Sequence, residues 1–288
     1  MTRKQAELLL AAIIIIRATG YLFSKVALRS LEPFNLLAIR FLLAFVLLCF
    51  ITRGRMKKLK IQTIGRGAVL GTTFFLTMGC EMLGLMTTDS SVTSFLENTA
   101  VVIVPLLQAV LMRRLPKPVI LISGLVTLTG IGFLTLQGAG GFQLTVGQLF
   151  CLGAALFYAM SIIITDRFSR KEDPLTLGIL QVGFIGLYSL IASLLFETTH
   201  LPTQPEAWGA IVVLAAVCTG LGFTLQPVAQ RGTTAERAGL FCALNPLTAS
   251  VLGVIILHEP FGLQSMMGGV LVLTGILLSK LGDMKKKK

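Results

Sequence analysis

Uncharged, apolar runs recur along the whole chain. The longest run without Asp, Glu, Lys, Arg or His extends from Pro118 to Thr165, 48 residues, and shorter ones cover 174–196, 207–230 and 238–257. A helix crosses a bilayer with about 20 apolar residues, so the longest run can hold two spans and each shorter run one. The pattern predicts an all-α membrane protein that crosses the bilayer many times.

Charge clusters and Gly/Pro runs divide the chain into ten predicted transmembrane helices. Their expected limits are 6–25, 33–52, 67–86, 91–111, 118–137, 147–165, 175–196, 207–226, 238–257 and 262–280.

The basic residues determine the predicted orientation of these helices. When both termini are placed in the cytoplasm, 21 of the 25 Lys and Arg residues fall in the inner segments. Lys25 and Arg29 then face outward, and Arg17 and Arg40 lie within spans. Because cytoplasmic loops carry the excess of Lys and Arg, we expect both termini to be cytoplasmic.

The composition supports the membrane assignment and narrows the chemistry. Only 13% of the residues are charged, against about 25% in soluble domains, and 54% are hydrophobic. The net charge of +12 follows the inner segments, so it marks topology rather than a nucleic-acid surface. The sequence has no Cys/His group at metal-ligand spacing and no nucleotide-binding Gly-x-x-x-x-Gly-Lys-Ser/Thr segment. We expect no metal, no cofactor and no nucleic-acid partner.

The second half of the chain repeats features of the first half. The segments 124–131 and 269–276 are identical at five of eight positions, 145 residues apart. Thr87-Thr88 and Thr233-Thr234 precede the fourth and ninth spans, and Glu32-Pro33 and Asp173-Pro174 precede the second and seventh. Five spans are an odd number, so a duplicated unit would enter the membrane from the opposite side.

The predicted architecture is therefore two inverted five-helix repeats around a central cavity. The first repeat is expected at 1–137 and the second at 147–280, with a linker at 138–146 and a basic cytoplasmic tail at 281–288. Two such bundles can rock past each other and open a central site to either side of the membrane, which is alternating access.

The last predicted hairpin carries a resemblance to a known family. Leu257–Gly275 has a Glu after an apolar helix, then a Gly and a second Gly seven residues later, and Asn245-Pro246 lies in the preceding helix. This pattern resembles the EamA-type ten-helix carriers of the drug/metabolite transporter superfamily. The first half departs from it, since Arg114 stands where a counterpart of Glu259 is expected and Pro105 lies one turn later than Pro246 predicts.

The resemblance implies a secondary carrier of small metabolites in a prokaryotic plasma membrane, frequently an exporter of amino acids or related compounds. We expect a small-molecule substrate and membrane lipids as partners and no enzymatic activity, and we leave open whether the carrier forms a homodimer. Two alternatives remain open: a multidrug or organic-cation efflux carrier, and a passive channel.

Four ionisable residues that lie well inside the predicted spans, away from their ends, form the expected substrate site. Arg17, Arg40, Glu81 and Glu97 would each cost about 3 kcal/mol in the bilayer core, so they should face each other, water or a solute. A zwitterion could place its carboxylate near Arg17 or Arg40 and its ammonium near Glu97 or Glu81. Glu97 is also the proposed proton-coupling residue.

Several neutral residues complete the expected site. Tyr21, Asn98, Tyr158 and Asn245 are predicted to contribute to substrate binding. Pro105 and Pro246 lie in the middle of predicted spans, where proline removes a backbone hydrogen bond, so each is a predicted kink or gate.

Overall fold

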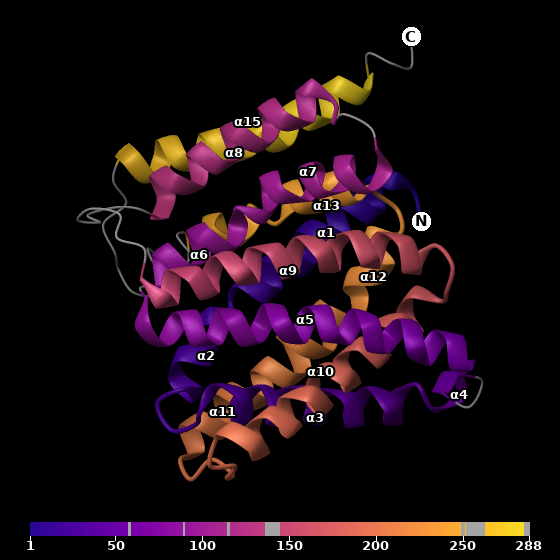
Figure 1. Ribbon diagram of the computed structural model, residues 1–288, viewed down its shortest axis with the longest axis vertical. Coiled ribbons are helices and arrows are strands. Elements are labelled where there is room, and N and C mark those ends of the chain that lie inside the picture. The colour runs from indigo at the N-terminus through magenta and orange to yellow at the C-terminus, as the bar shows by residue number, and fades with distance from the viewer. Residues whose placement is uncertain are drawn as a thin grey trace.

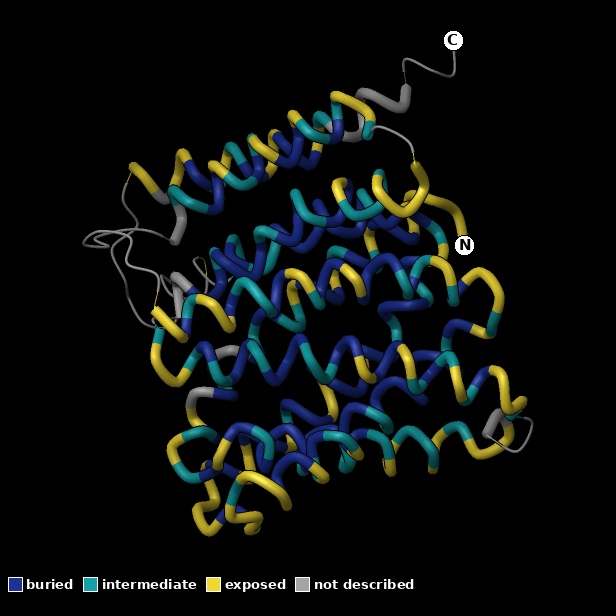
Figure 2. The backbone as a smooth tube through the Cα atoms, in the orientation of Figure 1, coloured by how far each residue is buried: buried dark blue, intermediate teal, exposed yellow. Residues whose placement is uncertain are grey.

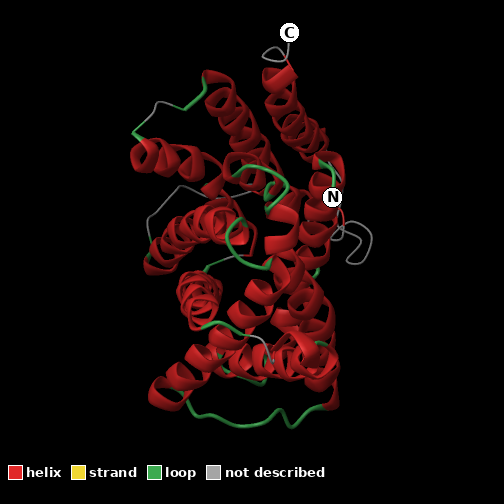
Figure 3. Ribbon diagram, turned by 90° about the vertical axis from the view of Figure 1, so that its right-hand side faces the viewer, coloured by secondary structure: helices red, strands yellow, loops and turns green. Residues whose placement is uncertain are grey.

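The computed structural model describes residues 1–56, 59–88, 90–113, 116–135, 145–248, 251 and 263–284. Within these ranges the chain is helical and contains no strand (Figure 3). The helices are α1 (Arg3–Ala18), α2 (Gly20–Ala27), α3 (Pro33–Ile51), α4 (Arg53–Met56), α5 (Ile61–Thr87), α6 (Ser90–Asn98), α7 (Ala100–Met112), α8 (Pro118–Thr135), α9 (Val146–Ser169), α10 (Pro174–Phe196), α11 (Pro205–Val213), the π-helical η1 (Leu214–Phe223), α12 (Thr224–Gln230), α13 (Ala235–Phe241) and α15 (Leu263–Met284).

Six helical segments of the described chain are long and apolar enough to cross a membrane, which makes this a multi-pass membrane protein. They are Pro33–Ile51, Ile61–Thr87, Thr93–Met112, Val146–Ser169, Pro174–Phe196 and Pro205–Gln230. Shorter apolar stretches lie in α8 and α15. Helix occurs in each of the ten expected ranges, but ten membrane crossings stay a prediction.

Some predicted segments lie outside the described residues. They include most of the linker, at 138–144, the first part of the last hairpin, at 257–262 with Glu259, and the end of the tail at 285–288.

Two helices begin with the same local signal. Thr2 and Gln5 form a capping box at the start of α1, and Thr145 and Gln148 form one at the start of α9. In each box the threonine hydroxyl accepts the glutamine N–H, and the glutamine side chain accepts the threonine N–H. These bonds satisfy backbone groups that a helix leaves without partners.

Glycines bring α8 and α15 into close contact along one edge of the molecule (Figure 1). A Cβ atom on Gly130 would lie 2.7 Å from the backbone N of Val272 and 2.8 Å from the O of Gly268. A Cβ atom on Gly275 would lie 2.8 Å from the O of Ser123 and 3.1 Å from the N of Thr127. A side chain at either glycine would push the two helices apart.

The helices α3 and α10 approach each other in a similar way. A Cβ atom on Gly183 would lie 2.7 Å from the ring of Phe45, and one on Gly186 would lie 2.9 Å from the backbone N of Leu42. Both contacts therefore depend on the absence of a side chain at the glycine.

Buried residues concentrate in the middle of the molecule, where an aromatic cluster forms part of the core (Figure 2). The rings of Phe41 and Phe74 meet the ring of Phe223 edge to face, with centroids 5.1 and 5.5 Å away. This geometry is favourable for aromatic pairs. The cluster joins α3 and α5 to the π-helical segment η1.

The loops at one end of α3 and α10 hold each other through two acidic side chains. The Glu197 carboxylate accepts the N–H groups of Phe34 at 2.9 Å and Asn35 at 2.7 Å. The Glu32 carboxylate accepts the N–H of Thr198 at 2.8 Å. The N-terminus lies at the opposite end of the helices (Figure 1).

Candidate functional site

Three irregular stretches of helix surround a small cavity. Thr19 separates α1 from α2, and Thr99 separates α6 from α7. Their hydroxyls donate to the carbonyls of Ile16 at 2.7 Å and Leu96 at 2.6 Å, bonds to the preceding turn that commonly bend helices. The third stretch is η1, and π-helical turns frequently occur at functional sites.

The cavity has a volume of about 30 Å³, room for about two water molecules. Its walls come from the first three spans, the α6 segment, η1 and the stretch after α13. The lining residues are Arg17, Gly20, Ser24, Arg40, Met78, Glu81, Glu97, Cys218, Phe223 and Asn245. All four ionisable residues that the sequence places inside spans therefore line the same cavity.

Arg17 is fixed from one side by neutral partners. Its Nη1 donates to the Gln226 amide oxygen at 2.8 Å and to the Tyr158 hydroxyl at 3.4 Å. The guanidinium carbon also lies 4.1 Å from the centre of the Phe223 ring, within the range of a cation–π contact.

Arg40 is also buried, and its hydrogen-bond partners among the described residues are neutral. Its Nε donates to the Thr219 hydroxyl at 3.3 Å and its Nη1 to the Ser24 hydroxyl at 3.4 Å. Its guanidinium carbon lies 4.8 Å from the centre of the Phe41 ring.

The two carboxylates of the cavity are buried among these cations. Glu81 is 5% exposed and Glu97 is 3% exposed. Glu81 lies within electrostatic reach of Arg40 and Arg17, and Glu97 within reach of Arg17. Among the described residues, neither arginine forms a direct ion pair, because the hydrogen-bond partners of both are neutral.

The other four predicted site residues lie in different positions relative to the cavity. Asn245 lines the cavity, while Tyr158 stands behind it, bonded to Arg17 and 3.2 Å from the Cys242 sulfur. Asn98 is buried outside the lining, and its amide donates to the Ser94 carbonyl at 2.8 Å, within its own helix. Tyr21 belongs to α2, but its side chain lies outside the described part of the structure. The roles assigned to all four in substrate binding stay predictions.

The two predicted gating prolines lie in helical backbone. Pro105 is inside α7, which continues through it, and the interruption of this span lies six residues earlier at Thr99. Pro246 is buried in the short helical stretch 244–248. A gating role for either proline stays a prediction.

Of the neutral residues that hold the two arginines, the sequence analysis named Tyr158 but missed three others. Gln226, Thr219 and Phe223 all come from the Pro205–Gln230 segment, far along the chain from Arg17 and Arg40. A buried glutamine in an apolar span was the one available signal, since an amide there requires a partner.

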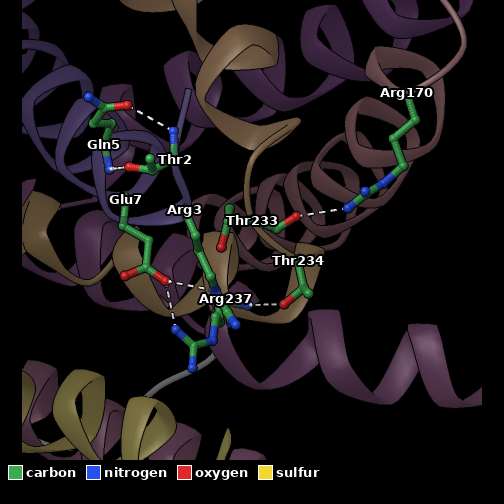
Figure 4. A network of polar contacts seen from close by, with 8 residues as sticks. All are labelled: Thr2, Arg3, Gln5, Glu7, Arg170, Thr233, Thr234 and Arg237. Atoms are coloured by element: carbon green, nitrogen blue, oxygen red, sulfur yellow. Dashed lines mark hydrogen bonds and ion pairs between the residues drawn. The ribbon is translucent and has the colours of Figure 1, made fainter. Parts of the chain in front are cut away.

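A second charged region joins the start of α1 to α13 (Figure 4). We call it the Glu7–Arg237 cluster; it comprises Thr2, Arg3, Gln5, Glu7, Arg170, Thr233, Thr234 and Arg237.

The centre of the cluster is a buried ion pair. Arg237 Nη1 lies 2.6 Å from Glu7 Oε1, and the two residues are only 5% and 6% exposed. Arg3 reaches the same carboxylate at 3.4 Å, and Arg170 donates to the Thr233 carbonyl at 2.9 Å. Glu7 precedes Arg17 by ten residues, so the pair lies about 15 Å along α1 from the cavity, towards the N-terminus.

The fold and the cavity define a multi-pass helical membrane protein with a cluster of buried charges at its centre. A single family model, the EamA-like transporter family, matches residues 4–136 and again residues 145–281. The chain belongs to this family, which supports a transport function.

Relatives and a solved structure agree with this assignment. An uncharacterized transporter from Archaeoglobus fulgidus is 26% identical over 281 residues, covering 97% of this chain and 87% of the relative. The uncharacterized transporter YvbV from Bacillus subtilis is 24% identical, covering 96% and 92%. One crystal structure superposes on 100% of both chains with a TM-score of 0.82 at 18% identity, which shows the fold alone.

Proposed function

We propose that this protein is a secondary carrier that moves a small zwitterionic metabolite, an amino acid or a close relative, across a prokaryotic plasma membrane. The observation that carries the proposal is the placement of two guanidinium groups and two carboxylates on one small cavity, with Arg40, Glu81 and Glu97 buried. Charge inside a membrane is costly and marks substrate pathways. A zwitterion complements such a wall, because its carboxylate pairs with an arginine and its ammonium with a glutamate.

An inverted repeat is the proposed basis of the architecture. The glycine contacts between α8 and α15 support it. Gly130 lies against residues 268 and 272, and Gly275 lies against residues 123 and 127. Adding 145 to 123, 127 and 130 gives 268, 272 and 275, so the two sets of contacts are equivalent when the repeats are exchanged. Such reciprocal contacts are expected at a two-fold axis.

The contacts of α3 and α10 follow the same rule. At an offset of 141, Gly183 corresponds to Leu42 and Gly186 corresponds to Phe45. The observed contacts are Phe45 with Gly183 and Leu42 with Gly186, so exchanging the repeats turns one contact into the other. The double match of one family model adds independent support for a duplication.

Alternating access is the proposed mechanism. Binding pockets for small molecules have volumes of about 300–1,000 Å³, far more than the cavity of about 30 Å³ offers, so substrate entry requires the helices to separate. The Glu7–Arg237 pair joins α1 to α13 at the end of the molecule that holds the N-terminus, which we propose is the cytoplasmic end. Formation of this ion pair would close the cavity to the cytoplasm while the opposite side of the protein opens.

Export is the proposed direction, and Glu97 the proposed proton carrier.

Two competing functions make different predictions. An organic-cation efflux carrier is disfavoured by two cavity arginines, which repel cations. A passive channel would conduct continuously and would show no stimulation by substrate on the far side.

The test is transport by purified protein in liposomes. Wild-type protein should take up a labelled amino acid, and Glu97→Gln should strongly reduce that uptake. Glu206→Gln removes an exposed carboxylate at the start of α11 and serves as the matched control, with uptake expected at the wild-type level. Uptake that is unchanged in Glu97→Gln would refute the role of Glu97, and no uptake of any amino acid would refute the substrate class.

A further inference from the structure

The two cavity arginines are held differently. On Arg17 one nitrogen, Nη1, makes both hydrogen bonds, and within the described chain Nη2 and Nε have no hydrogen-bond partner. On Arg40 both Nε and Nη1 donate to hydroxyls, and the residue is 5% exposed. Among the described residues, the Nε/Nη2 edge of Arg17 therefore has no hydrogen-bond partner, whereas the Nε of the corresponding edge of Arg40 is bonded; both residues line the cavity.

The partner that holds Arg17 most closely is uncharged. Gln226 is 2% exposed, is absent from the cavity lining and accepts from Nη1 at 2.8 Å. A carboxylate at this position would cancel the guanidinium charge, whereas an amide fixes the group and leaves its charge for a ligand. The Phe223 ring, 4.1 Å away, adds a second restraint without neutralising the charge.

We propose that Gln226 is a positioning residue that presents the free edge of Arg17 to the carboxylate of the substrate. The inference rests on the proposed function and deepens it, because it assigns the carboxylate to Arg17 and makes a carboxylate obligatory in the substrate. A planar guanidinium that is already oriented can bind a carboxylate through two parallel hydrogen bonds with little loss of side-chain entropy.

Two substitutions distinguish positioning from a merely structural role. Gln226→Glu keeps the side-chain length and the accepting oxygen but adds a permanent countercharge to Arg17. A structural role predicts that this variant behaves as wild type. A positioning role predicts that it folds but no longer recognises a carboxylate. Gln226→Met removes the hydrogen bond to Arg17 without adding charge. It should weaken the binding of carboxylates but keep the preference for an acid over its amide.

The experiment measures ligand-induced shifts of the melting temperature of purified protein in detergent. The probes are common amino acids, their amides, which lack the carboxylate, and the matching deaminated acids. Wild-type protein should bind an amino acid about tenfold or more tightly than its amide, the effect of a charge-assisted hydrogen bond. In Gln226→Glu this ratio should fall to about one.

Each outcome bears on a separate claim. A wild-type ratio in Gln226→Glu would overturn the positioning role. Amides that bind wild-type protein as tightly as the acids would overturn the assignment of a carboxylate to Arg17. Deaminated acids that bind while amino acids do not would refute the zwitterionic substrate but leave the positioning role intact. If no probe shifts the melting temperature of wild-type protein, both the positioning role of Gln226 and the proposed substrate class would be overturned.

Discussion

The cavity and the Glu7–Arg237 cluster both bury charge at α1, yet they treat it in opposite ways. In the cluster a guanidinium and a carboxylate lie 2.6 Å apart and neutralise each other directly. In the cavity the guanidinium groups of Arg17 and Arg40 donate to amide and hydroxyl oxygens instead. Charges that are paired directly are committed to the structure, whereas charges held by neutral groups remain able to bind a ligand.

The two regions should therefore respond differently to substitution. Changes in the cluster should alter stability, because they leave a buried charge without its partner. Changes in the cavity should alter binding and transport, with smaller effects on stability. Groups that are arranged to bind a ligand commonly do not maximise the stability of the ligand-free protein.

The largest effect on stability is expected at the ion pair. Arg237→Leu should destabilise the protein by about 3 kcal/mol, because it removes the guanidinium that lies 2.6 Å from the buried Glu7 carboxylate. Denaturation with SDS in mixed micelles measures this loss. The double variant Glu7→Leu with Arg237→Leu should recover most of it, since replacement of a whole buried pair is often neutral. A double variant less stable than the single one would contradict this view of the cluster.

A smaller effect is expected at the residue that orients Arg237. The Thr234 side chain accepts the N–H of Arg237 and caps α13. Thr234→Ala should cost about 1 kcal/mol, whereas Thr234→Ser, which keeps the accepting oxygen, should cost much less. Equal losses in the two variants, measured by the same denaturation, would show that the cap contributes nothing.

A cavity carboxylate should behave differently from Glu7. Glu81 is buried but makes no direct ion pair with a described residue. Glu81→Gln removes its attraction to the two arginines, but it also removes the free-energy cost of burying a carboxylate, so the two effects partly cancel. We expect stability to change by less than about 1 kcal/mol and amino acid uptake to fall. A loss of stability as large as that of Arg237→Leu, with uptake retained, would reverse the distinction between the two regions.

The smallest effect is expected at the exposed margin of the cluster. Arg170 pairs with Asp166 at 2.7 Å, but half of its side chain is exposed. Arg170→Ala should therefore change the free energy of unfolding by about 0.5 kcal/mol, the range of surface ion pairs. A loss of several kcal/mol would show that the buried part of the cluster extends to Arg170.

Much of this arrangement follows from the sequence, because a membrane limits what charges can do. Arg17, Arg40, Glu81 and Glu97 stand out in apolar segments, and the cost of burying them predicts that they come together. Helix location is predictable for the same reason, since backbone groups in lipid must be paired within the segment.

The remaining features depend on contacts that no local pattern encodes. Gln226 lies 209 residues from Arg17, and Arg237 lies 230 residues from Glu7. Before the fold is known, Arg237 reads as a loop cation and Gln226 as an ordinary polar residue near the end of a span. The break at Thr99 has no glycine or proline beside it, and the π-helical turns of η1 have no residue signature.

Transport through the charged cavity is tested most directly by counterflow in proteoliposomes. Unlabelled amino acid trapped inside the vesicles should speed the entry of labelled amino acid severalfold in wild-type protein, because a loaded site returns across the membrane faster than an empty one. Arg17→Ala should abolish this stimulation, and the exposed-site variant Glu206→Gln should retain it. Entry that does not depend on the trapped amino acid, or stimulation that persists without Arg17, would contradict a carrier built around this cavity.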